Sequence, residues 1–272
     1  MESTQNEISV IICTYNSERY LKETLDSLIP FTNFIAEIIF VDGQSSDNTV
    51  TILKAHEINN IFNVIFISSP PSGVSQAMNI GASQAKGEYL AFLNSDDFWN
   101  WTPLIESELK NVLSSSNYDL VLFSCVYLYD RYRVSHMVEL SKNVFFGLFL
   151  NNRIYHPSTL IQKSFFIKME GFCDFYPTAF DYDFWIRSSK SAKMLVSQIG
   201  LATFRVHSDS LSFKYRKGAI FEILKIRIKN ADNVSLIFIS YLLFFRDTAL
   251  FVLFYFKALW PRLKRLWLKL FT

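Results

Sequence analysis

The sequence predicts an α/β fold in which a mostly parallel sheet lies between helices. Apolar runs rich in β-branched residues alternate with segments of helical spacing over the first hundred residues. The apolar runs lack polar alternation, which is typical of parallel strands that helices cover on both faces. Each run ends in a short polar segment, as expected where a strand leaves a sheet.

The expected elements follow one another in strict alternation in this first part. Strands are predicted at residues 8–13, 38–41, 64–67 and 89–93. Helices are predicted at residues 17–28, at residues 49–58 after a capping Asp47, and through Met78 and Ala82. Beyond about residue 101 the signals mix, with a strand at 120–128 and helices near 143–149 and 181–189.

Composition and charge narrow the class of protein. Half of the 272 residues are hydrophobic, including 27 Phe, which excludes disorder and predicts a large core. The three cysteines are scattered without C-x-x-C spacing, so we expect free thiols in a reducing compartment. The polar, acidic first residues do not resemble a secretory signal peptide, so we expect a cytoplasmic protein.

The last part of the chain has a different character. Apolar residues fill 234–245 and 248–260 on either side of Arg246 and Asp247, and neither half reaches the roughly 20 residues of a spanning helix. The alternative is a span through Arg246 and Asp247, which is costly because both charges would lie near its centre. After Asp247 the chain carries five cations and no acid, and residues 1–247 have a net charge of −3. Such a tail indicates an anionic membrane surface more than nucleic acid.

An amphipathic helix is predicted at the end of this tail. Its apolar face would hold Leu259, Leu263, Leu266, Trp267 and Leu270, and its basic face Arg262, Arg265 and Lys269. This pattern is expected of a helix lying in the membrane plane. The alternative is a helix that packs on its own domain or on a partner.

Residues 87–97 form an apolar strand that runs into the acidic pair Asp96 and Asp97. Neighbouring carboxylates raise each other's pKa unless a cation neutralises them. We therefore expect Mg²⁺ or Mn²⁺, held by carboxylate oxygen and by substrate phosphates. The alternative is that one of these residues caps a helix that begins near Trp101.

Three polar segments follow strands that we expect to be neighbours, at residues 14–16, 42–47 and 94–97. In parallel sheets, ligands bind at the carboxyl ends of the strands. The carboxylates, amides and aromatic ring of these segments suit a nucleotide with a metal. The sequence contains no dinucleotide-binding G-x-G-x-x-G after the first strand and no G-x-x-x-x-G-K-[ST] phosphate loop.

Four ordered motifs resemble those of family-two inverting glycosyltransferases of the GT-A fold. They are S-V-I-I-C-T-Y-N at 9–16, I-F-V-D-G-Q-S-S-D-N-T at 39–49, G-E-Y-L-A-F-L-N-S-D-D at 87–97 and D-Y-D-F-W at 181–185. The resemblance covers about residues 8–212. The chain departs from the family pattern at Cys13 (Pro), Gly43-Gln44 (Asp-Gly), Asn94 (the first acid of D-x-D) and Phe180 (Glu).

The resemblance implies a nucleotide-sugar donor. Thr14, Tyr15, Asn16 and Glu18 would lie near its base or ribose. Asp42 would accept a hydrogen bond from the nucleobase, with Tyr15 stacked on the base, and Asn94 would bind ribose hydroxyls. The alternative for Asp42 is a carboxylate that forms the turn before Gly43.

The resemblance also implies the metal site. Asp96 would be the metal ligand, with Asp97 as a further ligand, a support for it or a donor contact, and His207 would reach the metal or the diphosphate. The metal would offset the charge that builds on the leaving nucleoside diphosphate. His207 lies in an R-x-H segment and His156 in an H-P-x-T-like segment, and a structural role is an alternative for both.

Asp181 matches the family's general base, which takes the proton of the acceptor hydroxyl as it attacks the anomeric carbon. Asp183 is the alternative base, unless it is a surface carboxylate or pairs with Arg187 one helical turn away. Trp185 would line the sugar or acceptor pocket or pack in the core.

Together these observations predict a metal-dependent inverting glycosyltransferase on the cytosolic face of a membrane. The acceptor would be a hydroxyl of a lipid-linked or growing surface glycan, and no nucleic acid is expected as a partner. We expect a catalytic domain at 1–216, with a nucleotide-binding half at about 1–100 and an acceptor half at 101–216, and a helical region at 217–272. The alternatives are an inactive nucleotide-sugar-binding or scaffolding protein and a sugar-phosphate nucleotidyltransferase.

Overall fold

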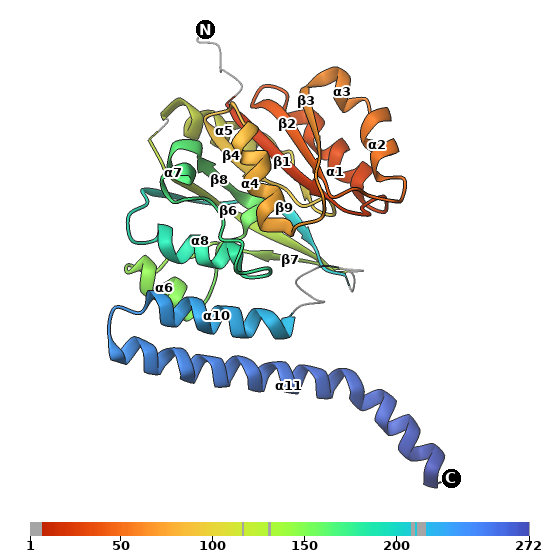
Figure 1. Cartoon of the computed structure of the whole chain (residues 1–272), viewed down its shortest axis with the longest axis vertical. Helices are drawn as coiled ribbons and strands as arrows, with labels where there is room; N and C mark the ends of the chain where they lie inside the picture. The colour runs from red at the N-terminus through yellow and green to blue at the C-terminus, as the bar shows by residue number, and fades with distance from the viewer. Residues whose placement is uncertain (1–6, 116, 130–131, 208–209, 211–215, 272) are drawn as a thin grey trace. The chain divides into compact units, whose positions relative to one another are not determined.

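The computed structural model describes residues 7–115, 117–129, 132–207, 210 and 216–271, and for residue 216 and residues 254–271 it describes the backbone alone. The chain divides into two compact units, Met1–Ser210 and Leu211–Thr272. Each unit is described separately below (Figure 1).

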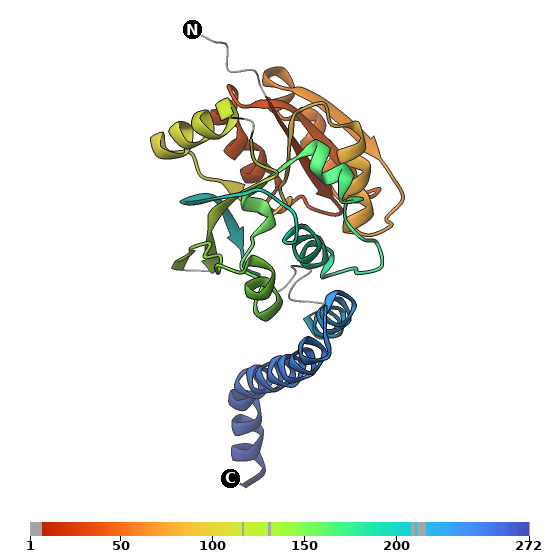
Figure 2. The same cartoon turned by 90° about the vertical axis from the view of Figure 1, so that its left-hand side faces the viewer.

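The first unit is built on one twisted sheet with helices on both faces (Figures 1 and 2). Four of its strands lie side by side and all parallel, in the order β3-β2-β1-β4. They are β1 (Ile8–Thr14), β2 (Ile35–Asp42), β3 (Asn63–Ser68) and β4 (Tyr89–Phe92). The four strands expected in the first hundred residues are therefore confirmed.

The sheet continues past β4 in the order β8-β6-β9-β5, with β7 paired to β6. These strands are β5 (Phe98–Trp99), β6 (Leu120–Tyr129), β7 (Tyr132–His136), β8 (Thr159–Gln162) and β9 (Met194–Arg205). Here β6 and β9 are parallel, and β8 runs antiparallel to both β4 and β6. The α/β class is confirmed, and the sheet is parallel in its first part and mixed in its second.

The helices of the first unit are mostly short. They are α1 (Leu21–Leu28), α2 (Thr49–Ala55), α3 (Ile58–Ile61), α4 (Val74–Gln84), α5 (Pro103–Ser115), α6 (Val144–Leu150), α7 (Lys163–Lys168) and α8 (Phe180–Ser188), with 3₁₀ turns η1 (Ile29–Phe31) and η2 (His156–Ser158). The helix expected at 49–58 is divided in two. Asn59 explains the break, because its amide donates to the carbonyls of Leu53 and His56 and so ends α2.

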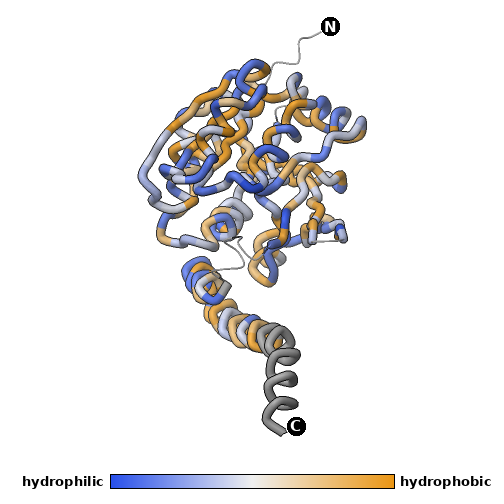
Figure 3. Tube along the Cα trace, turned by 90° about the vertical axis from the view of Figure 1, so that its right-hand side faces the viewer, coloured by the Kyte–Doolittle hydropathy of each residue, from blue (hydrophilic) through white to orange (hydrophobic). Residues whose placement is uncertain are grey.

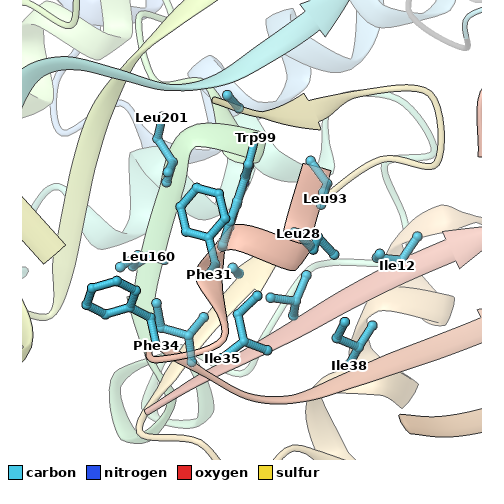
Figure 4. Close-up of a cluster of buried hydrophobic side chains, with 14 of the residues drawn as sticks. Ile12, Leu28, Phe31, Phe34, Ile35, Ile38, Leu93, Trp99, Leu160 and Leu201 are labelled. Carbon is cyan, nitrogen blue, oxygen red and sulfur yellow. The ribbon is translucent and has the colours of Figure 1, made fainter. Parts of the chain in front are cut away.

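The core lies on both faces of the sheet. On one face, Phe31 and Trp99 pack edge to face with ring centroids 5.0 Å apart, within the cluster shown in Figure 4. On the other face, α4 approaches β1 so closely that a Cβ at Gly81 would lie 2.5 Å from Ile11 Cγ2. Glycine at position 81 therefore sets the distance between this helix and the strands that carry the site.

The second unit is an antiparallel pair of helices, α10 (Arg216–Asn230) and α11 (Val234–Phe271). The rings of Phe221 in α10 and Phe244 in α11 lie 5.2 Å apart. Figure 3 shows hydrophobic residues recurring along the coloured part of α11. The amphipathic face predicted from Leu259 to Leu270 concerns side chains outside the described residues, so it stays a prediction.

Helix α11 is continuous through Arg246 and Asp247, the two charges that divide its apolar run. Asp247 accepts hydrogen bonds from Arg227 of α10 at 3.3 Å and from Arg246, and these contacts hold its charge within a helix. A membrane span would therefore have to include both charges, as expected from the length of each apolar half. The continuous helix contains a segment, Val234–Leu253, that is long and apolar enough to cross a membrane by length and composition.

Candidate functional site

The polar segments that follow β1 and β2 are joined to each other by hydrogen bonds. The backbone amide of Asn16 donates to Ser45 Oγ at 2.9 Å, and the amide of Ser46 donates to Asn16 Oδ1 at the same distance. Asn16 adopts a positive φ of 50°, which asparagine tolerates better than most residues. The two segments thus form one surface at the carboxyl ends of the strands.

Glu18 strengthens this connection. Its Oε2 atom accepts hydrogen bonds from the backbone amide and the side-chain amide of Asn48, at 3.0 and 2.8 Å. Asp47 accepts from the backbone amides of Glu18 at 3.2 Å and Thr49 at 3.0 Å. The expected cap at Asp47 is shifted by one residue, because Asn48 occupies the N-cap position of α2 and Asp47 precedes it. In this structure the carboxylates of Glu18 and Asp47 organise the two loops.

Asp42 is buried under this surface. Its Oδ1 accepts from Thr14 Oγ1 at 2.8 Å and from Ser45 Oγ at 2.6 Å, and its Oδ2 accepts from the Ser45 amide at 2.9 Å. A carboxylate has about four acceptor positions, so three are used within the protein. The geometry matches the turn-forming alternative for Asp42, with about one position left on Oδ2 for another donor.

Tyr15 is the exposed aromatic group of the surface. Its side chain is 60% exposed, and a Cβ at Gly43 would lie 3.2 Å from Tyr15 Cδ2. The ring therefore rests on the glycine backbone and presents apolar area to solvent. An exposed ring beside a polar turn is suited to stacking on a planar ligand.

Asp97 is buried at the next strand end. Asn94 donates its side-chain amide to Asp97 Oδ2 at 2.7 Å, and the backbone amide of Arg205 donates to Asp97 Oδ1 at 2.8 Å. Burial, and next the neighbouring charge of Asp96, raise the pKa of the Asp97 carboxyl well above its usual range. Asp97 thereby connects the loop after β4 to the end of β9.

Asp96 and His207 meet on the accessible side of the same loop. His207 Nε2 lies 2.8 Å from Asp96 Oδ2, and their side chains are 14% and 27% exposed. Arg205 supports the pair, because its Nε donates to the carbonyl of Asp96 at 3.1 Å. Two residues that are 111 positions apart in the chain are thus brought together as one oxygen and one nitrogen donor.

Arg205 and Tyr20 are site residues that the sequence did not reveal. The Arg205 guanidinium lies 4.3 Å from the centroid of the Tyr20 ring and pairs with Glu23, and the His207 ring lies 5.2 Å from the same tyrosine. The R-x-H spacing is a sequence signal for Arg205, because it links Arg205 to His207. It does not reveal that Tyr20 and Glu23, at the start of α1, contact the arginine.

The described residues contain no group of three or more His, Cys, Asp and Glu side chains that could hold a metal ion. Two protein ligands are nevertheless enough for Mg²⁺, which is commonly bound by one or two carboxylates together with substrate phosphates and water. Neighbouring ligands of an octahedral ion with bonds of about 2.1 Å lie roughly 3.0 Å apart. The 2.8 Å between Asp96 Oδ2 and His207 Nε2 is a hydrogen-bond distance, and it also places one oxygen and one nitrogen close enough together to share an ion with substrate phosphates.

Asp181 lies in the first turn of α8. Its Oδ1 accepts a hydrogen bond from the amide of Tyr182 at 2.7 Å. Burial raises the pKa of Asp181 to about 6, and the hydrogen bonds from the backbone oppose that rise. A carboxyl group of this kind is suited to exchange a proton near neutral pH.

Asp183 occupies a different environment on the same helix. It is fully buried, and its Oδ2 accepts from Arg187 Nε at 2.7 Å. Arg187 also donates to the carbonyls of Met169 and Gly171. The expected pairing of Asp183 with Arg187 is therefore present, and it lies in the core and not at the surface.

Trp185 and His156 are both enclosed. Trp185 has no exposed surface, which matches the core-packing alternative. His156 Nε2 is buried without a hydrogen-bond partner in the described part of the structure, and burial lowers the pKa of His156 to about 4. His156 is therefore neutral at physiological pH and has the environment of a structural residue.

Residues 9–173 match the family described as Glycosyl transferase family 2. An uncharacterised glycosyltransferase of Rickettsia bellii is 26% identical over 215 residues, which cover 76% of this chain and 31% of that protein. A poly(ribitol-phosphate) beta-N-acetylglucosaminyltransferase, TarS of Staphylococcus aureus, is 36% identical over 98 residues, covering 35% of this chain and 17% of TarS. The chain spans about a third of the length of the first Rickettsia relatives that it matches.

Two solved structures share the fold. The crystal structure of S. aureus TarS 1–349 in complex with UDP-GlcNAc has a TM-score of 0.62 and 24% identity, over 84% of this chain and 68% of that one. The mannosyltransferase PcManGT of Pyrobaculum calidifontis, in complex with GDP-Man and Mn²⁺, has a TM-score of 0.59 and 14% identity, over 82% and 63%. The arrangement of strands in the first unit is thus that of the GT-A fold. With a family match over most of the first unit, the chain belongs to glycosyl transferase family 2.

Proposed function

We propose that this protein is an inverting glycosyltransferase that moves a sugar from a nucleoside-diphosphate donor to a hydroxyl group. The observation that carries the proposal is the contact of Asp96 with His207 at the strand ends where Tyr15 is exposed. The exposed aromatic ring would serve the nucleotide base, and the carboxylate and imidazole would serve the metal ion that accompanies the diphosphate. Donors of this kind are bound by the two structural relatives, TarS with UDP-GlcNAc and PcManGT with GDP-Man.

The donor base would stack on the exposed ring of Tyr15, beside the loops that Asn16 and Glu18 organise. Asp42 would accept from the base edge with its remaining position on Oδ2, while Thr14 and Ser45 hold the carboxylate in place. Asn94 is engaged with Asp97, so it would reach the ribose through the oxygen of its side-chain amide.

Asp96 and His207 would hold Mg²⁺ or Mn²⁺ together with the donor diphosphate. When bound, the metal would offset the negative charge that develops on the departing nucleoside diphosphate. Asp97 would support the site from below, because its carboxyl group fixes the loop of Asp96 and the end of β9. The Mn²⁺ of PcManGT is consistent with a metal in this fold.

Asp181 would be the general base. An acceptor hydroxyl must lose a proton as its oxygen attacks the anomeric carbon, and the raised pKa of this carboxyl suits that transfer. Asp183 is less suited to take a proton from an acceptor, because it is buried and paired with Arg187. We therefore assign the base to Asp181.

The acceptor would be a hydroxyl of a lipid-linked or growing surface glycan, and the protein would act on the cytosolic face of a membrane. The supporting features are the basic composition after Asp247 and the apolar α11 segment Val234–Leu253. TarS, named for transfer to poly(ribitol-phosphate), is a relative whose named acceptor is a polymer.

A screen of nucleotide sugars by thermal stabilisation would test the donor proposal. A ligand that binds only the folded state raises the melting temperature. At a hundredfold excess over its Kd it adds about 2.7 kcal/mol to the free energy of unfolding. We expect stabilisation by one or a few donors in the presence of Mn²⁺ and its loss with EDTA. Asp96→Ala should abolish the effect, and Asp174→Ala, which alters an exposed aspartate, should preserve it.

Product analysis would then separate the proposed enzyme from a binding protein. A stabilising donor incubated with a lipid-linked saccharide should release nucleoside diphosphate and give a glycoside of inverted configuration. Donor binding without release in the presence of several acceptor classes would instead favour a non-catalytic binding protein.

A further inference from the structure

One side of α11 packs against α10. Its residues are Leu236, Ser240, Leu243 and Asp247, which recur at intervals of four, three and four and therefore share one helix face. The two leucines are 9% exposed and Ser240 is fully buried. The contact between the two helices therefore explains why this face of α11 is buried.

The other side of α11 carries an apolar stripe that the described structure leaves exposed. We define the stripe as Val234, Phe238, Tyr241, Phe245 and Val252, which align along the helix because their spacings are close to whole turns. Their exposed fractions are 80%, 64%, 46%, 65% and 44%. Soluble monomers rarely expose large apolar residues in a contiguous row, so the stripe indicates a contact surface.

The distribution of charge identifies the kind of surface that would cover the stripe. Residues 211–272 contain 12 Lys and Arg against 3 Asp and Glu, a net charge of +9, whereas residues 1–210 contain 15 against 22, a net charge of −7. Two copies joined through their stripes would bring together two units of +9. An anionic lipid surface offers both apolar area for the stripe and opposite charge for the cations around it.

The contact with α10 determines how α11 meets that surface. Lys217, Lys225 and Lys229 are exposed on α10, and Arg227 is buried against Asp247 of α11. If α11 crossed the bilayer with α10 attached, these lysines would enter the hydrocarbon at a cost of about 3 kcal/mol each. With α11 in the plane of the membrane, α10 remains on its water-facing side and its lysines stay outside the hydrocarbon.

The charges within α11 are compatible with this placement. Asp247 is neutralised by Arg227 at 3.3 Å and by Arg246 at 2.6 Å. The side chain of Arg246 is 48% exposed on the flank of the helix between the stripe and the face that packs on α10, and its long stem can extend to the headgroups. No charged residue therefore belongs to the stripe itself.

We infer that α11 lies in the plane of an anionic membrane, with the apolar stripe inserted in one leaflet and α10 on the aqueous side. The inference rests on the membrane association given under the proposed function, and it adds the contact surface and the orientation. It also assigns to the helix hairpin a lipid-binding role that is separate from catalysis.

Vesicle binding by the full-length protein would test the contact surface. Vesicles of phosphatidylcholine and phosphatidylglycerol in equal amounts should bind the protein, and vesicles of phosphatidylcholine alone should bind it more weakly. Phe238→Ser and Phe245→Ser should each weaken binding by about tenfold, since inserting a phenylalanine is worth roughly 1.5 kcal/mol or more. Phe175→Ser is the matched control, because Phe175 is 70% exposed in the first unit and should have no effect.

Depth measurements would test the orientation. Nitroxide labels on Phe238→Cys, Phe245→Cys and Val252→Cys, in a background with Cys13, Cys125 and Cys173 replaced by alanine, should all report the same shallow depth. A gradient of depths along the three positions would overturn the in-plane arrangement.

The remaining outcomes separate this inference from the proposed function. Unchanged vesicle binding in both serine variants would show that other residues make the contact, and the inference would fail while membrane association stands. Dimerisation without lipid that is lost in the serine variants would assign the stripe to a second copy. A protein that ignores both kinds of vesicle would refute the membrane association itself, whatever its donor binding.

Discussion

The side-chain amide of Asn94 donates a hydrogen bond of 2.7 Å to the carboxyl group of Asp97, which has no exposed surface. The family pattern has an acid at position 94, and the amide is one of two donors that hold Asp97 in the described structure, the other being the backbone of Arg205. A neutral donor at position 94 lets a carboxyl group remain buried beneath the site.

Asn94→Asp should therefore destabilise the metal-free protein. The substitution places two carboxyl groups within hydrogen-bond distance, and a buried unpaired charge of this kind costs about 1–3 kcal/mol or more. The folded-state pKa of the pair would be raised, so the loss should be small at low pH, where one group is protonated, and should grow as pH rises through that pKa. Thermal melts from pH 4 to pH 8 would measure it, with Asn94→Ala as a comparison that removes the donor without adding a charge and should show a smaller pH dependence. A constant difference between Asn94→Asp and the wild type would contradict the assignment.

Asp96 and Asp97 should differ in what their removal changes. Asp96→Ala should alter the free energy of unfolding by less than about 1 kcal/mol, because a partly exposed pair contributes little. Asp97→Ala should cost about 2–4 kcal/mol, because it leaves the Asn94 amide and the Arg205 backbone amide without their buried acceptor.

Denaturant unfolding and Mn²⁺ titration, carried out on both variants, would distinguish the two roles. Loss of Mn²⁺-dependent donor binding without loss of stability is expected for Asp96→Ala. If Asp97→Ala were as stable as the wild type and lacked only metal binding, Asp97 would be a ligand and not a support.

Asp181 and Asp183 provide a second contrast, within a single helix. Asp181→Asn should lower kcat by about 10²-fold or more, the usual scale for the loss of a general base, with donor affinity nearly unchanged. Asp183→Asn should cost about 3 kcal/mol of stability, because it breaks the buried pair with Arg187.

Steady-state kinetics with circular-dichroism melts on both variants would check this ranking. Rescue of Asp183→Asn activity at lower temperature would be consistent with its structural role. A stable Asp183→Asn variant without activity, together with an active Asp181→Asn variant, would show that Asp183 is the general base.

The sequence was sufficient to predict the first four strands because each is an uninterrupted apolar run. Parallel strands covered on both faces have no other common sequence pattern, and their polar ends mark the edge at which the site lies. The loop residues after β1, β2 and β4 could be named for the same reason. The resemblance placed Asp96 and His207 at the same metal, but their direct contact depends on the path of β9, which local sequence does not give.

Other features depend on side chains from distant segments. The burial of Asp97 requires the backbone of Arg205, 108 residues away, and the burial of Asp183 requires carbonyl groups that precede α8. Local sequence gives no measure of such contacts. Asp247 of α11 likewise pairs with Arg227 of another helix, a contact that local sequence does not reveal.

The pH dependence of turnover should follow the carboxyl group of Asp181. Burial raises the pKa of this group to about 6, and a general base must be deprotonated to act. We therefore expect kcat/KM to fall about tenfold per pH unit below pH 6 and to be level between pH 7 and pH 8. Asp181→Asn should lose this acidic limb along with most of its activity.

Deprotonation of Asp181, which activity requires, should lower the stability of the fold. Because its folded-state pKa lies above its unfolded value of about 3.9, folding favours the protonated form, and the associated stability is present below pH 4 and is lost as pH rises through about 6. Relative to the wild type, Asp181→Asn should therefore gain stability between pH 4 and pH 7. Initial rates and melting temperatures measured in the same buffers would test both statements, and an acidic limb that persists in Asp181→Asn would assign the proton transfer to another group.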